Sequence, residues 1–155
     1  MADTYLTKQG LEKMRAEHAL LMKRKTQLTE EVTKAAAHGD LRENAEYHAA
    51  RERLQHVAKR LAEVDGKLMS VRITDDLELK AGEARIGTTV TLQDEVTKEK
   101  FGYTLVGPDE ADPANGKLSI ASPLGQAVLG KKKGEVFTLA LPRATVPYKV
   151  VSVTR

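Results

Sequence analysis

Two carboxylates stand three positions apart in the middle of the chain. Asp40 and Glu43 follow Gly39 within the stretch "HGDLRENAEYHAARE", which runs from His38 to Glu52. Carboxylates at this spacing can share one hard cation, and Mg²⁺ commonly takes one or two protein carboxylates and completes its octahedron with waters and phosphate oxygens. The pair therefore predicts half of a magnesium site, which a partner would have to complete.

The same two residues have a purely structural interpretation. Asp at a helix N-cap and Glu three residues later form a capping box, which satisfies free N–H groups at the start of a second helix. The residues alone leave both interpretations open. His38 and His48 flank the pair and suggest zinc, but nothing in their spacing directs both rings to one point, so solvent-exposed histidines are the preferred interpretation.

Two apolar ladders flank these residues, and their steps alternate between three and four. The first comprises Leu11, Met14, His18, Leu21, Lys25, Leu28, Val32 and Ala35, and the second comprises Tyr47, Ala50, Leu54, Val57, Leu61, Val64, Leu68 and Val71. This is the 3.5-residue period of a coiled-coil seam. Residues 1–74 are therefore predicted to form an antiparallel helical hairpin, with an acidic tip near residues 38–46 and arms about 45 Å long.

The second half of the chain has a different pattern. After a linker at residues 75–84, short β-rich runs alternate with turn signals: "TVTLQD", "FGYTLVG", "KLSIAS", "EVFTLAL" and "YKVVSV". Between Ser122 and Gly130 a short helix is predicted, with Pro123 at its first position. Residues 85–155 are expected to form an antiparallel sheet of about five strands with one packed helix, which makes the chain an α+β protein.

Composition narrows the class of protein. The 155 residues include no cysteine, which excludes disulfides and thiolate metal sites and fits a reducing compartment. The N-terminus lacks the apolar core of a signal peptide, and no stretch approaches the roughly 18 apolar residues of a membrane span. A soluble cytoplasmic protein is expected.

Basic residues near the tip suggest a nucleic-acid partner. The net charge is +3, and the whole excess lies in the first 72 residues. Arg51 and Arg53 lie two to three helical turns from the acidic pair, so a phosphate backbone that reaches the tip would pass near them. Arg42, between the two acids, is grouped with them as a candidate nucleic-acid-binding residue.

Three separated motifs carry a family resemblance. "HGDLRENAEYHAARE" closely resembles the tip motif of the GreA-type bacterial transcript cleavage factors. "YTLVGPDEADPANGKLSIASPLGQAVLGKKKGE" resembles their C-terminal domain, and "LTKQGLEKMRAEHALL" resembles their N-terminal helix. The motifs agree in order and spacing, and the likeness covers nearly the whole chain.

The resemblance implies a fold and a function. In that family an antiparallel coiled coil enters the secondary channel of RNA polymerase, and an FKBP-like domain docks on the rim of the channel. By this resemblance Asp40 and Glu43 help to hold a Mg²⁺ in the active centre of the polymerase, where the 3′ end of backtracked nascent RNA is hydrolysed. Arg51 matches an arginine beside the family's tip. Ser122, Pro123, Leu124 and Gly125 fall in the region associated with polymerase docking.

The chain is accordingly expected to be a monomeric transcription elongation factor that stimulates the polymerase's own cleavage activity and is not itself an enzyme. Two alternatives stay open. A channel blocker would share the fold and docking without cleavage, and the two tip acids argue against it. A prolyl isomerase is suggested only by the FKBP-like domain, whose aromatic residues, Phe101, Tyr103, Phe137 and Tyr148, are few for the pocket that such an enzyme needs.

Overall fold

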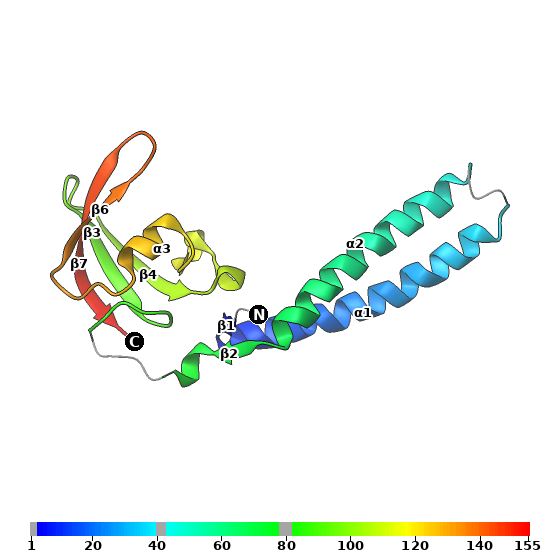
Figure 1. Cartoon of the computed structure of the whole chain (residues 1–155), viewed down its shortest axis with the longest axis horizontal. Coiled ribbons are helices and arrows are strands. Elements are labelled where there is room, and N and C mark those ends of the chain that lie inside the picture. Colours follow the sequence, from blue (N-terminus) through cyan, green and yellow to red (C-terminus); the bar gives the residue numbers. More distant parts are fainter. Residues whose placement is uncertain (1–2, 40–42, 78–81) are drawn as a thin grey trace. The chain divides into compact units, whose positions relative to one another are not determined.

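The computed structural model describes residues 3–39, 43–77 and 82–155. The chain divides into two compact units. The first comprises residues 1–4 and 9–71, and the second comprises residues 5–8 and 72–155. We call them the hairpin unit and the sheet unit. The fold class is confirmed, because a pair of long helices is followed by a β-sheet with one short α-helix packed against it (Figure 1).

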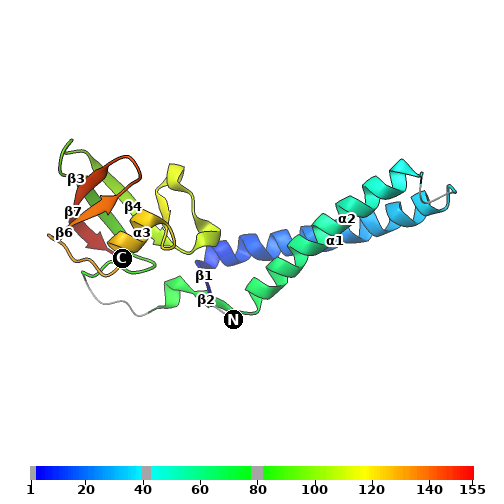
Figure 2. The same ribbon diagram turned by 45° about the horizontal axis from the view of Figure 1, so that its top comes forward.

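The hairpin unit consists of α1 (Lys8–Ala36) and α2 (Ala45–Leu68), which lie side by side in Figures 1 and 2. Both ladders face the seam: every ladder residue is buried or half-buried except Lys25, which is exposed. The most buried are Met14, Leu28, Ala35, Ala50, Leu61 and Val64. Burial of this one apolar stripe stabilises two helices whose other faces are mostly polar, with Leu20 and Met22 exposed on α1.

Polar contacts across the seam confirm the antiparallel pairing. The Arg60 guanidinium donates to both carboxylate oxygens of Glu17, at 2.7 and 3.1 Å, and this hydrogen bonding raises the pKa of Arg60. Further along, His18 Nε2 lies 2.6 Å from Asp65 Oδ1. His18 therefore has a partner on the opposite arm, as a register-setting seam residue should.

The sheet unit contains all five predicted strands. They are β3 (Thr89–Asp94), β4 (Lys100–Val106), β5 (Lys117–Ser119), β6 (Val136–Ala140) and β7 (Thr145–Thr154), in the order β5-β4-β3-β7-β6. The predicted helix is α3 (Pro123–Val128). A separate two-stranded sheet joins β1 (Thr4–Leu6) to β2 (Val71–Ile73), which is followed by a 3₁₀ turn at Thr74–Asp76.

One strand pair differs from the antiparallel prediction. β4 and β5 are parallel, with Leu105 opposite Leu118. Parallel neighbours need a connection that carries the chain back to the end of the sheet at which the first strand began. Here it runs through two 3₁₀ turns, Pro108–Glu110 and Pro113–Asn115. The segment between these two strands is therefore a crossover and not a hairpin.

The core of the sheet unit is a single apolar cluster. Val90, Leu92, Leu105, Val128 and Val150 are fully buried in it. Ala84, in the predicted linker, also belongs to this cluster and donates its backbone N–H to Lys131 O. The rings of Phe137 and Tyr148 stack at the edge of this cluster, with centroids 5.7 Å apart.

Within the described residues, neither α1, α2 nor α3 combines the length and the apolar character that a membrane crossing requires.

Candidate functional site

The start of α2 tests the capping interpretation of the acidic pair. Asn44 is the N-cap: its backbone is extended, and its side-chain oxygen accepts a hydrogen bond from the Tyr47 N–H at 3.0 Å. Glu43 therefore precedes the cap, whereas a capping box would need it at the third helical position. The capping-box interpretation of Asp40 and Glu43 is wrong, because α2 begins four residues later than it requires.

The other end of the Asn44 side chain contacts α1. Its Nδ2 donates to the carbonyl oxygen of Ala35 at 2.6 Å, and the same carbonyl accepts the His38 N–H at 3.1 Å. Gly39 follows with φ +123°, a backbone conformation that favours glycine. The two helix ends are thus tied together at the base of the tip.

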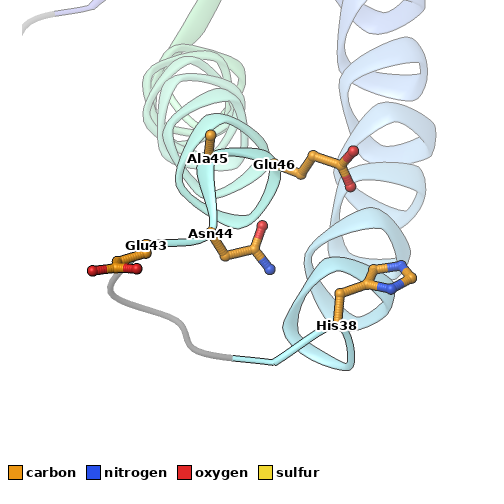
Figure 3. A pocket seen from close by; sticks show the side chains of 5 residues that line it. All are labelled: His38, Glu43, Asn44, Ala45 and Glu46. Carbon is orange, nitrogen blue, oxygen red and sulfur yellow. The ribbon is translucent and has the colours of Figure 1, made fainter.

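A shallow hollow of about 570 Å³ lies at the tip, lined by His38, Glu43, Asn44, Ala45 and Glu46. Figure 3 shows that the Glu43 carboxylate points away from α1, whereas the Glu46 carboxylate points toward it. Glu43 is exposed. Its oxygens are therefore open to an approaching ligand. Asp40 and Arg42 lie outside the described residues.

The described part of the tip offers hard oxygen donors but no complete metal site. Among residues 3–39, 43–77 and 82–155, no three His, Cys, Asp or Glu side chains come together as metal ligands. An exposed carboxylate fits Mg²⁺, which prefers oxygen ligands and retains waters. The zinc interpretation gains no support from this result, which covers both His38 and His48. The His48 ring packs edge-on against Tyr47, with centroids 5.4 Å apart.

The two candidate arginines of α2 differ in their surroundings. Both Arg51 and Arg53 are exposed. Arg53 faces α1, where its guanidinium lies 3.7 Å from the Glu31 carboxylate and lines a groove of about 280 Å³ with Lys34 and His38. Part of its charge is therefore offset, and Arg51 is the better candidate for a phosphate contact.

The four predicted docking residues form one turn of the sheet unit. The Ser122 hydroxyl donates to Ser119 O at 2.6 Å and accepts the Gly125 N–H at 3.1 Å. Leu124 packs against the core cluster, and Gly125 is buried. Only Pro123 among the four is exposed. The polymerase contact stays a prediction, with Pro123 as the presented side chain and the other three as the residues that shape the turn.

The close packing of this turn favours glycine at position 125. A Cβ added there would lie 2.0 Å from the Ser119 carbonyl oxygen, far inside van der Waals contact.

Asn44 is the residue that sequence reasoning missed. The signal was present, because Asn ranks with Asp as an N-cap residue and stands directly before the helical run "AEYHAA". The contact with Ala35 had no such signal.

Comparison with known proteins agrees with this architecture. Residues 4–73 match the family model "Transcription elongation factor, N-terminal", and residues 79–155 match "Transcription elongation factor, GreA/GreB, C-term". The chain is 39% identical over 150 residues to "Transcription elongation factor GreA" of Thermodesulfovibrio yellowstonii, covering 96% of this chain and 95% of that one. It is 40% identical over 155 residues to the protein of the same name from Thioalkalivibrio sulfidiphilus, with 99% and 98% covered.

Among solved structures, a crystal structure of Thermus aquaticus Gfh1 is 26% identical and aligns over 100% of both chains with a TM-score of 0.44. The two family models together span almost the entire sequence, and neither describes a prolyl isomerase. The chain therefore belongs to the GreA/GreB family of transcription elongation factors.

Proposed function

We propose that this transcription elongation factor inserts the tip of its hairpin into the secondary channel of RNA polymerase and stimulates Mg²⁺-dependent cleavage at the 3′ end of backtracked nascent RNA. The observation that carries the proposal is the position of Glu43. It is exposed beyond the N-cap of α2, with Asp40 three residues earlier in the sequence.

The length of the hairpin suits this role. The 29 residues of α1 span about 43 Å at 1.5 Å per residue. A rod of this length can carry the tip carboxylates into an active centre that its base never enters. The seam burial and the cross-seam ion pairs keep the two arms together along that distance.

Two carboxylates are an incomplete ligand set, so we assign the remaining ligands to the polymerase and to RNA phosphates. When bound, a Mg²⁺ would polarise the scissile phosphate and lower the pKa of a coordinated water. The residues of this chain would hold the metal ion and orient the RNA. Asp40 and Glu43 would provide oxygen ligands for Mg²⁺, while Arg51 would steady the RNA through a phosphate contact. The protein is thus an accessory factor, and the hydrolytic centre is the polymerase's own.

Docking is assigned to the sheet unit, at the turn that presents Pro123. A docked sheet unit raises the effective concentration of the tip at the channel without adding contacts to the RNA. We infer that one copy of the chain acts as a monomer in the bacterial cytoplasm, where transcription takes place.

The test is a stalled, backtracked elongation complex whose RNA is labelled at its 5′ end. Added protein should produce shortened RNA in the presence of Mg²⁺, and the Asp40→Asn/Glu43→Gln variant should bind the complex without producing it. Binding of the wild-type protein without shortened RNA would make it a channel blocker.

A further inference from the structure

Asn44 lies between the end of α1 and the start of α2, and its side chain contacts both helices. We propose that Asn44 is a positioning residue that fixes the Glu43 carboxylate relative to the hairpin axis. The inference rests on the proposed function, because it assigns Asn44 a task in presenting the tip carboxylates.

Helix ends leave backbone groups without intrahelical partners. The last four carbonyls of a helix and its first four N–H groups need other hydrogen-bonding partners. Asn44 provides a partner for one carbonyl and for one N–H group. Its Nδ2 donates to Ala35 O at 2.6 Å, and its Oδ1 accepts from the Tyr47 N–H at 3.0 Å. One planar amide therefore sets the separation between the end of α1 and the start of α2.

The acceptor on α1 is itself held in place. Ala35 is only 6% exposed in the seam, and its carbonyl also receives the His38 N–H. An amide bound to this carbonyl is anchored to the packed part of the hairpin. The start of α2 is thereby anchored to the packed seam of the hairpin.

Glu43 is joined directly to this anchored residue. The extended backbone of Asn44, with φ −84° and ψ 96°, turns the chain away from the path of α2. Figure 3 shows the result, with the Asn44 amide directed toward α1 and the Glu43 side chain directed outward. A carboxylate that must bind a metal at a fixed point is positioned more precisely when the residue that supports it is held by such hydrogen bonds.

The two hydrogen bonds can be separated by substitution. Asn44→Ser and Asn44→Asp both retain an oxygen that caps α2, but neither has the N–H₂ that donates to Ala35. Asn44→Ala removes both hydrogen bonds. A role confined to capping predicts that Ser and Asp restore full function, whereas a positioning role predicts that they do not.

The experiment measures RNA cleavage in the backtracked complex as a function of the concentration of the full-length protein. For Asn44→Ser and Asn44→Asp we expect the maximal cleavage rate to fall about tenfold, the lower end of the range for residues that orient a metal ligand. The half-saturating concentration and the thermal unfolding temperature should stay close to those of the wild type.

A second arm tests whether Asn44 acts through Glu43. In a Glu43→Gln background, Asn44→Ser should cause little further loss, since the carboxylate that it positions has been removed. Wild-type maximal cleavage by Asn44→Ser, or an undiminished loss in the Glu43→Gln background, would overturn the positioning role. If the wild-type protein itself shortens no RNA, the proposed function fails first, and the inference fails with it.

Discussion

The two units of this protein place their candidate functional residues in opposite ways. In the hairpin unit one stripe is buried and the candidate residues Glu43, Arg51 and Arg53 are exposed. In the sheet unit three of the four candidate docking residues are buried or half-buried, and only Pro123 is exposed. The candidate residues of the hairpin unit therefore present exposed side chains at or near its tip. Those of the sheet unit mainly determine the shape of a backbone turn. Substitutions should accordingly change the rate of cleavage in the first unit and the affinity for polymerase in the second.

The largest effect is expected at the tip. The Asp40→Asn/Glu43→Gln variant should lose about a hundredfold in cleavage rate at saturation, or roughly 2.7 kcal/mol, while polymerase binding is retained. Raised Mg²⁺ should restore part of the rate, because a weakened site refills by mass action. The measurement is single-turnover RNA cleavage.

Glu46→Gln is the matched control for the tip. It removes a carboxylate in the same hollow, but one that points toward α1 (Figure 3), and should cleave almost normally. Near-normal cleavage by the double variant would sink the metal-ligand role of the acidic pair.

The next effect is expected in the docking turn. Gly125→Ala places a Cβ 2.0 Å from Ser119 O, so the turn must shift at a cost of about 1–3 kcal/mol. We expect the half-saturating concentration to rise about tenfold, since 1.4 kcal/mol corresponds to tenfold in affinity, with the cleavage rate at saturation unchanged. Titration of the protein against the backtracked complex measures both quantities.

Gly102→Ala is the control in the same sheet, because a Cβ at that position meets nothing within 4 Å. A lower rate at saturation with an unchanged half-saturating concentration for Gly125→Ala would place chemistry in the sheet unit and break the comparison.

A smaller effect is expected for Arg51→Ala. Loss of one phosphate contact should weaken cleavage a few-fold at low salt, and the difference from the wild type should shrink as salt rises, because one fewer counterion is released. Cleavage at subsaturating protein over a salt series measures this slope. Lys13→Ala, which removes an exposed charge near the start of α1, should leave the slope unchanged, and a salt-independent loss at Arg51 would indicate a structural role.

The smallest effect concerns the stability of the rod. Arg60→Ala removes two hydrogen bonds to Glu17, at 2.7 and 3.1 Å, and should lower the free energy of unfolding by about 0.5–1 kcal/mol. Arg53→Ala, whose contact with Glu31 is 3.7 Å, should have almost no effect. Thermal unfolding followed by circular dichroism distinguishes them, and a stability unchanged by either substitution would show that seam packing alone holds the arms together.

Local patterns in the sequence predicted most of the fold. The seam could be recognised because a 3.5-residue period is repeated within each arm, and every predicted strand lies between turn residues. The parallel pairing of β4 with β5 could not, because it depends on where the chain returns after Pro108 and Pro113. Strand pairing of this kind is a property of the whole sheet and leaves no signature in either strand.

The candidate site was predictable in its residue types but not in its contacts. "DLREN" contains two good N-cap residues, Asp40 and Asn44, and only the observed start of α2 chooses between them. Burial of Gly125 against Ser119 O likewise depends on the packing of α3 onto the sheet. Both features arise from hydrogen bonds or close contacts between segments, which residue types alone do not specify.

The hydrogen bond between His18 and Asp65 has a consequence for the length over which the two helices pair. Heptad seams can slip by seven residues and still match apolar positions, and such a slip would shorten the paired length by about 5 Å, half of the 10.5 Å rise of one heptad. A slipped hairpin would lose the His18 contact at one end and the Asn44 contact with Ala35 at the other. Two polar contacts, one near each end of an otherwise repetitive seam, thus select a single paired length, so every copy of the protein has its tip at the same distance from the base of the hairpin.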